Sequence, residues 1–107
     1  MPSLSVIIPT YNEIDYLEDA VSSVDFADEI IVVDSYSTDG TAELAEKLGC
    51  KVLKRKFDNF SNQKNFALIQ VKSDWILFID ADERVTQRLK TEILKAIKSN
   101  RYEGYKI

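Results

Sequence analysis

With 107 residues, of which 45% are hydrophobic and 30% charged, the chain has the size and composition of one ordinary globular domain and is too short for a multidomain enzyme. Its net charge of −4 argues against a nucleic-acid partner, because duplex binding needs a basic face that neutralises phosphates. The chain contains no histidine, which excludes His-activated nucleophiles and imidazole zinc sites, so any chemistry would depend on carboxylates.

The first half of the chain predicts two strand and helix units. Residues 4–8 are a short apolar run that stops at Pro9, which is typical of a strand buried on both faces. After Asn12, apolar residues recur at helical spacing. A second strand is predicted at residues 30–33. A helix follows at residues 41–48, with an aspartate, Asp39, as its N-cap.

The third unit consists of a strand at residues 52–54 and a helix at residues 61–71, capped by its first residue, a serine. We expect this helix to present Phe66 and Ile69 to the core. Lys64 is expected in its first turn.

The run at residues 75–79 predicts a fourth strand, which stops at the acidic segment 80–83. Thr86 is expected to cap a last helix, and residues 102–107 to begin a fifth strand. The apolar stripe of the last helix consists of Leu89, Ile93, Ala96 and Ile97.

Four alternations of strand and helix, with strands that are apolar throughout, predict a doubly wound α/β fold: a mostly parallel sheet with helices on both faces. Ligands of such sheets bind outside the carboxyl ends of the strands. The predicted strand ends carry polar residues, which are Thr10, Tyr11, Asn12, Asp34, Ser35, Arg55, Asp80 and Asp82.

The lengths of the apolar runs and the composition of the N-terminus bear on where the protein is located. Its apolar runs are far shorter than the about 20 residues of a membrane span. The N-terminus lacks the basic and apolar regions of a secretory signal. The lone Cys50 cannot form an intrachain disulfide, and we expect it to be a small residue of the core. We expect a cytoplasmic protein, or one peripheral to the inner face of the membrane.

Asp80 and Asp82 are candidates for binding a divalent cation. Two carboxylates at i and i+2, at the end of a strand, project to the same side of the chain. Mg²⁺ takes one or two protein carboxylates and completes its shell with water and substrate phosphate. The alternative is a solvated acidic loop whose carboxylates cap the helix that begins near Thr86.

Three further residues have a functional and an ordinary interpretation. Lys64, at a helix N-terminus, suits a phosphate, or is a surface lysine. Asp34 can accept hydrogen bonds from a nucleobase or ribose, or is a turn residue. Tyr11 can stack on a base, or is a half-buried ring that covers the sheet end.

Three segments together resemble family 2 glycosyltransferases with the GT-A fold. They are VIIPTYNE at residues 6–13, IVVD with STDGT within residues 31–41, and FIDADE at residues 78–83. The segment NQKNFA, with DERV at residues 82–85, is similar to the branch that adds sugars, often glucose, to the lipopolysaccharide inner core.

The resemblance implies a transferase that uses a UDP-sugar, inverts the anomeric centre by direct displacement, and acts on a saccharide or glycolipid acceptor. It implies that Asp82 ligates Mg²⁺ or Mn²⁺ and that Asp80 lies near the ribose. It places Lys64 near base and phosphates. The implied uridine pocket consists of Pro9, Thr10, Tyr11 and Glu13, with Asp34 and Ser35 beside the base.

Two features depart from the family. Many members have Asp-Asp-Gly where this chain has Asp34, Ser35 and Tyr36, which leaves the base identity open. Members also continue into an acceptor-binding half that supplies the catalytic base. We therefore expect residues 1–107 to be a single nucleotide-sugar-binding domain that is inactive alone and self-associates through its C-terminal strand.

Two other functions compete with this interpretation. A non-catalytic nucleotide or nucleotide-sugar binding module would share the same donor site. A phosphoacceptor receiver domain has the same type of sheet, but its first strand should end in carboxylates, and this one ends in Pro9 and Thr10.

Overall fold

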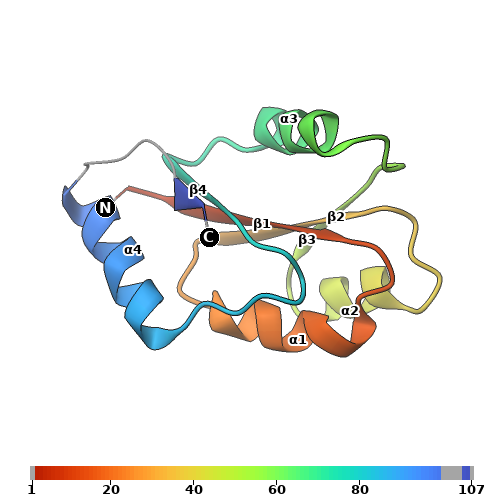
Figure 1. Cartoon of the computed structure of the whole chain (residues 1–107), viewed down its shortest axis with the longest axis horizontal. Helices are drawn as coiled ribbons and strands as arrows, with labels where there is room; N and C mark the ends of the chain where they lie inside the picture. The colour runs from red at the N-terminus through yellow and green to blue at the C-terminus, as the bar shows by residue number, and fades with distance from the viewer. Residues whose placement is uncertain (1, 100–104, 107) are drawn as a thin grey trace.

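The computed structural model describes residues 2–99 and the backbone of residues 105–106. Within these residues strands and helices alternate as predicted (Figure 1). The elements are β1 (Leu4–Thr10), α1 (Ile14–Ser23), β2 (Glu29–Asp34), α2 (Thr41–Lys47), β3 (Lys51–Lys54), α3 (Phe60–Gln70), β4 (Trp75–Phe78), α4 (Gln87–Ser99) and β5 (Tyr105–Lys106).

The strands form one sheet in the order β3-β2-β1-β4-β5, with every neighbouring pair parallel. On the central strand β1, Ile7 lies opposite Ile31 of β2 and Phe78 of β4. The predicted doubly wound α/β fold is confirmed. The carboxyl ends of β1, β2, β3 and β4 therefore meet at one edge of the sheet.

Successive residues of β1 face opposite sides and supply two cores. Val6 and Ile8 pack in the larger core, beneath α1, α2 and α4. Ile7 packs in a smaller core that includes Ala67 of α3. Among the helices that the structure describes, α3 is the one that covers this side of the sheet (Figure 1). Cys50 is buried in the larger core as predicted, and burial raises the pKa of its thiol.

Helix α3 corrects two expectations. Its N-cap is Asn59, whose side chain accepts a hydrogen bond from the Asn62 N–H at 2.8 Å, and not Ser61. Ile69 does not reach the core, because its side chain is 79% exposed. Gln63 and Ala67 are the buried residues of α3, and a residue two positions beyond Ala67 points away from the sheet. Phe66 is half-buried against the smaller core, as expected.

The other helix starts also differ in detail. The N-cap of α2 is Gly40, with a φ of 93°, so the predicted N-cap Asp39 lies one residue earlier. Thr86 is confirmed as the cap of α4, because its hydroxyl accepts a hydrogen bond from the Leu89 N–H at 3.1 Å. The expected fifth strand is described only at residues 105–106, and the rest of the range 102–107 lies outside the described residues.

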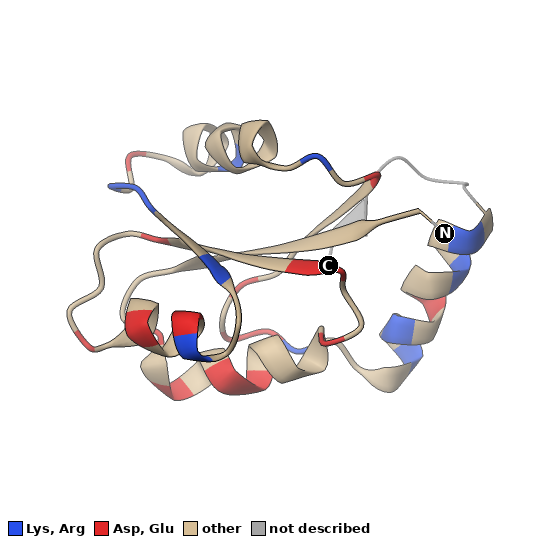
Figure 2. Cartoon of the chain, turned by 180° about the vertical axis from the view of Figure 1, so that it is seen from behind, with Lys and Arg blue, Asp and Glu red and all other residues tan. Residues whose placement is uncertain are grey.

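Charge is distributed unevenly over the fold. Figure 2 shows Asp and Glu concentrated on α1 and α2, while Lys and Arg are concentrated on α4. In the part of the chain that the structure describes, no helix is both long and apolar enough to cross a bilayer.

Candidate functional site

A cavity of about 1280 Å³ opens at the carboxyl edge of the sheet. Its walls come from the ends of β1, β2 and β4, the loop after β3, and one side of α3. Eight of the nine residues proposed from the sequence line it, namely Pro9, Thr10, Tyr11, Glu13, Ser35, Lys64, Asp80 and Asp82. Tyr11 is 61% exposed at this edge, so it is not the half-buried ring of the alternative interpretation.

Asp34 is the ninth proposed residue, and it does not line the cavity. Its side chain is fully buried and accepts hydrogen bonds from the Thr10 hydroxyl at 2.7 Å, the Ser37 hydroxyl at 2.6 Å and the Ser37 N–H at 2.9 Å. These bonds join the end of β1 to the loop after β2. Asp34 therefore supports the cavity wall from behind, and Ser35 faces the cavity in its place.

The loops after β1 and β2 are tied to each other by side-chain hydrogen bonds. The amide oxygen of Asn12 accepts from the Thr38 N–H at 2.8 Å, and the Asn12 N–H donates to the Ser37 hydroxyl at 2.8 Å. Asp39 accepts from the N–H groups of Ile14 and Thr41. Desolvation raises the pKa of Asp39, but these bonds and the one from the Thr41 hydroxyl lower it by a larger amount, so the net shift is downward.

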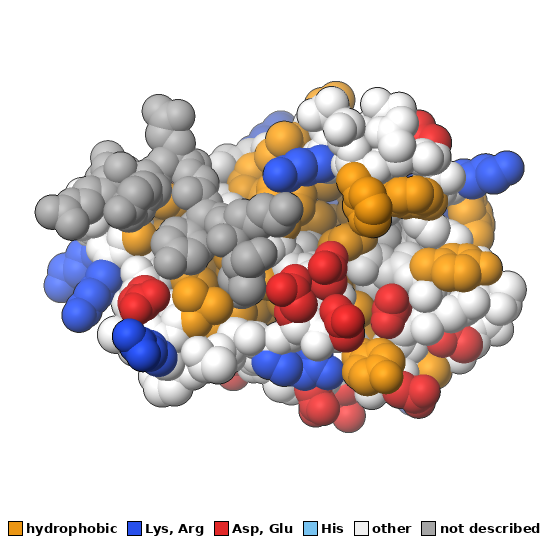
Figure 3. All heavy atoms as spheres, in the orientation of Figure 1, with side chains coloured by type: hydrophobic (Ala, Val, Ile, Leu, Met, Phe, Trp, Pro, Cys, Tyr) orange, Lys and Arg blue, Asp and Glu red, His pale blue; other side chains and the backbone are white. Residues whose placement is uncertain are grey.

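Four carboxylates line the cavity where β1 and β4 end: Glu13, Asp80, Asp82 and Glu83. In Figure 3, acidic side chains gather at the centre of the visible face, beside hydrophobic ones. Burial raises the pKa of Glu13, and the nearby charges of Asp82, Asp39 and Asp80 raise it further. The cavity therefore holds unbalanced negative charge, which a cation would relieve.

The loop between β4 and α4 is anchored on both sides. Glu83 accepts a hydrogen bond from the Asp80 N–H at 2.7 Å, and Arg84 donates to the Ala81 carbonyl at 2.8 Å. The Val85 N–H donates to the Ser23 hydroxyl of α1 at 3.0 Å. The side-chain cap at the Leu89 N–H of α4 is Thr86.

The acidic end of the cavity fits a divalent cation. Asp82 is exposed, and within residues 2–99 it has no hydrogen bond or ion pair. No group of three or more His, Cys, Asp or Glu side chains in that range is arranged to hold a metal by itself. One or two carboxylates with ligand phosphate oxygens is the set that Mg²⁺ commonly uses, and Asp82 and Asp80 supply such oxygens.

Lys64 lines the cavity but lies in the second turn of α3, because the helix begins at Phe60 and not at residue 61. The free N–H groups of the helix end therefore do not support it as expected. Its Nζ lies 5.0 Å from the centre of the Phe78 ring of β4, so the ammonium group is held on the β4 side of the cavity.

The apolar wall of the cavity near β3 was not predicted from the sequence. Tyr36, Phe57 and Phe60 line the cavity, and the rings of Phe57 and Phe60 meet edge to face with centres 5.1 Å apart. Gln63 also lines it and is 6% exposed. The signal available was the pair of aromatic residues in the segment that follows β3 at the ligand-binding edge.

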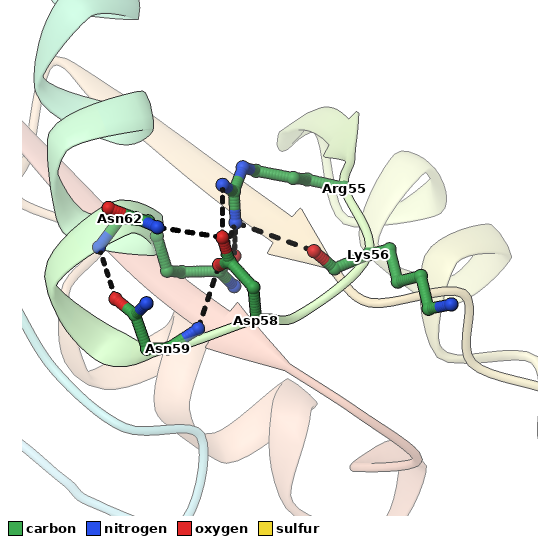
Figure 4. Close-up of polar contacts among 6 residues, drawn as sticks. Arg55, Lys56, Asp58, Asn59 and Asn62 are labelled. Carbon is green, nitrogen blue, oxygen red and sulfur yellow. Dashed lines mark hydrogen bonds and ion pairs between the residues drawn. The ribbon is translucent and has the colours of Figure 1, made fainter.

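Arg55 organises this loop (Figure 4). It donates to both carboxylate oxygens of Asp58, at 2.8 and 3.3 Å, and to the side-chain oxygen of Gln63 at 3.3 Å. The hydrogen bonds to Asp58 from Arg55, Asn62 and the Asn59 N–H hold the pKa of that carboxyl well below its ordinary value. The hydrogen bond between Arg55 and Asp58 also raises the pKa of the Arg55 guanidinium.

Relatives of known name align over most of this chain. It is 45% identical over 108 residues to an uncharacterized glycosyltransferase of Rickettsia bellii, which covers 97% of this chain and 37% of that protein. It is 37% identical over 92 residues to the lipopolysaccharide core biosynthesis glycosyltransferase LpsC of Rhizobium meliloti, with 81% and 34% covered. The chain thus spans little more than a third of the length of these relatives.

Two solved structures share the fold. Staphylococcus aureus TarS 1-349 in complex with UDP matches with a TM-score of 0.70 and 28% identity, over 92% of this chain and 33% of that one. Glucosyl-3-phosphoglycerate synthase of Mycobacterium tuberculosis, in complex with Mn²⁺, UDP and glucosyl-3-phosphoglycerate, matches with a TM-score of 0.66 and 27% identity, over 75% and 33%.

Residues 5–106 match the family described as "Glycosyl transferase family 2". This match includes all three segments on which the resemblance rests. The chain therefore belongs to glycosyl transferase family 2.

Proposed function

We propose that residues 1–107 form the donor-binding domain of a metal-dependent glycosyltransferase that uses a UDP-sugar. The main support is that eight residues, predicted as site residues from four separate segments of the chain, line one cavity. The UDP and Mn²⁺ bound by the M. tuberculosis relative support the choice of ligand and cofactor. The acceptor would be bound by the part of the relatives that this chain does not match.

In this proposal the two ends of the cavity bind different parts of the donor. Asp82, with Asp80, would hold Mg²⁺ or Mn²⁺ against the diphosphate, and Lys64 would add a positive charge on the same side. The metal, when bound, supplies charge neutralisation to the diphosphate leaving group. Tyr11 and Ser35, with Pro9 and Thr10 beside them, would contact the nucleoside.

The transfer itself is proposed to invert the sugar by direct displacement. The acceptor hydroxyl attacks the anomeric carbon and loses its proton to a base, while the bond to the diphosphate oxygen breaks. Glu83 is a poor candidate for that base because its carboxylate already accepts a hydrogen bond from the Asp80 N–H. We therefore expect no sugar transfer by this chain alone, and a non-catalytic binding module remains the alternative function.

The biological setting follows from the relatives by analogy. LpsC is named for lipopolysaccharide core biosynthesis, and this chain shares 37% identity with it. We infer that the acceptor is a saccharide or glycolipid of lipopolysaccharide or another cell-surface polysaccharide, and that a hexose is transferred. We also infer that the protein is cytoplasmic or peripheral to the inner face of the membrane.

We infer in addition that copies of this chain self-associate through the sheet edge at β5. Sedimentation would measure this association.

A thermal-shift experiment tests the donor site. UDP, GDP, dTDP and ADP are added with Mn²⁺ or with EDTA. UDP at ten times its dissociation constant should add about 1.4 kcal/mol and raise the midpoint by roughly 5–10 °C, but only with Mn²⁺. Asp82→Asn should abolish the shift. Asp25→Asn, an exposed carboxylate outside the cavity, is the matched control and should retain it.

Equal shifts in Mn²⁺ and EDTA would contradict the metal assignment, and no shift with any nucleotide would contradict the donor site. Release of UDP from a UDP-sugar, measured on this chain and on a full-length relative, separates the enzyme from the binding module. Transfer by this chain alone would show that the base lies within these residues.

A further inference from the structure

Gln63 is a polar side chain in the wall of the cavity to which neither the sequence nor the comparisons assign a role. It lies on α3 and is 94% buried, and it lines the cavity. A buried amide needs hydrogen-bond partners, because an unpaired polar group costs about 1–3 kcal/mol. The partners of its two ends therefore indicate what it can bind.

The orientation of the Gln63 amide is determined by Arg55. The Arg55 guanidinium donates to Gln63 Oε1 at 3.3 Å, and a guanidinium has donors only, so the oxygen of the amide must face it. Nε2 then points away from Arg55. Within residues 2–99, Nε2 has no hydrogen-bond acceptor. None of the unpaired side-chain nitrogens in that range is fully enclosed, so Nε2 must reach the surface of the cavity. Nε2 is therefore a donor open to a ligand.

Arg55 is itself held in place, so the amide cannot turn over freely. Both of its terminal nitrogens bond to Asp58, and its guanidinium lies 5.5 Å from the centre of the Phe66 ring. Asp58 also accepts from Asn62 at 2.8 Å (Figure 4). This network keeps a hydrogen-bond donor directed at the ligand, which is the arrangement that gives a site specificity.

The position of Gln63 in the sheet layout indicates which part of a ligand it meets. Its contact with Arg55 places it beside the end of β3, whereas the carboxylates Asp80 and Asp82 follow β4. Three strand spacings of about 4.8 Å separate β3 from β4, or roughly 14 Å. Lys64, the next residue on α3, contacts Phe78 of β4 instead. Gln63 therefore lies toward the end of the cavity away from the proposed metal.

We propose that Gln63 Nε2 donates a hydrogen bond to the 4-oxo group of a pyrimidine base, and that Gln63 determines the specificity for uracil over cytosine. The inference rests on the proposed donor function. Asp34 cannot make this selection through its carboxylate, because that group is bonded to Thr10 and Ser37. Cytosine carries an amino group at the same position, so its N–H would meet the N–H of Gln63 without an acceptor between them.

The test compares the affinities for UDP and CDP by isothermal titration calorimetry in Mn²⁺. Gln63→Leu keeps the bulk of the side chain and removes the donor. It should weaken UDP binding about tenfold or more, and it should not weaken CDP binding, because the donor that opposes the cytosine amino group is gone. Gln63→Glu, which has only acceptors when ionised, should shift the ratio further toward CDP. Gln70→Leu, the same change at an exposed position of α3, is the control and should bind UDP as the wild type does.

Arg55 is a positioning residue, and a double-mutant cycle tests that role. Arg55→Met should reduce the ratio of UDP to CDP affinity, and adding it to Gln63→Leu should not reduce the ratio further. Additive losses would show that Arg55 acts independently of Gln63. Circular dichroism and the thermal midpoint identify any variant that fails to fold.

The outcomes separate this inference from the donor function. If wild type binds UDP and Gln63→Leu binds it within twofold, or loses UDP and CDP affinity equally, Gln63 does not read the base. If wild type does not bind UDP at all, the proposed function fails first, and the base assignment fails with it.

Discussion

Replacing Asp34 distinguishes a structural from a ligand-binding role at this position. The resemblance implies that Asp34 lies beside the base, whereas its carboxylate is buried and bonded to Thr10 and Ser37. In Asp34→Ala, the buried Thr10 hydroxyl and the Ser37 N–H lose their acceptor. We therefore expect the free energy of unfolding to fall.

The magnitude follows from the three hydrogen bonds. Bonds to a charged group contribute about 1.5–3 kcal/mol each, but the exposed ends of the loop can recover some bonding from water, so we expect a total loss of about 2–4 kcal/mol. In a domain of 107 residues this corresponds to a fall in the thermal midpoint of roughly 10–20 °C.

Differential scanning calorimetry of Asp34→Ala and Asp82→Ala measures the contrast. Asp82 is exposed, so its removal should change the midpoint by no more than a few degrees while abolishing metal-dependent UDP binding. An Asp34→Ala protein with a wild-type midpoint and no affinity for UDP would refute the structural role and restore the contact with the base.

Other substitutions test the site, a helix cap and a perturbed carboxyl. Lys64→Ala should weaken UDP binding by about 1–3 kcal/mol in calorimetric titration and leave the fold intact; affinity within twofold of wild type would make Lys64 an ordinary surface residue. Asn59→Ala should cost about 1 kcal/mol in urea unfolding, and Ser61→Ala close to none, because Asn59 is the N-cap of α3; equal losses would contradict this. Glu13→Gln should raise the midpoint at pH 7, because the raised pKa of Glu13 means that its charge is unfavourable in the folded state. This advantage should shrink as the pH falls through the raised pKa of Glu13, because the folded wild type then takes up the proton and loses the unfavourable charge. An advantage that grows on acidification would be the contrary result.

The order of elements and the ligand-binding edge were predictable from the sequence. Apolar runs such as residues 75–79 indicate buried strands, and their alternation with helical spacing predicts a parallel sheet, because a crossover helix brings the chain back to the edge of the sheet where the previous strand began. Since all strands of such a sheet point the same way, residues as distant as Tyr11 and Asp82 were expected at one edge, and both line the cavity.

The roles of side chains at that edge were decided by the tertiary structure. Asp34 ends one apolar strand and Asp82 follows another, and only packing buries the first against Thr10 and exposes the second. The rotation of α3 is likewise a tertiary property: its apolar residues do not define one stripe, so the sequence could not show that Ile69 faces outward and that Gln63 faces the cavity. Contacts between segments far apart along the chain decide these positions: Thr10 donates to Asp34 across two strands, and Ala67 of α3 packs on Ile7 of β1. The local spacing of residues contains no record of such contacts.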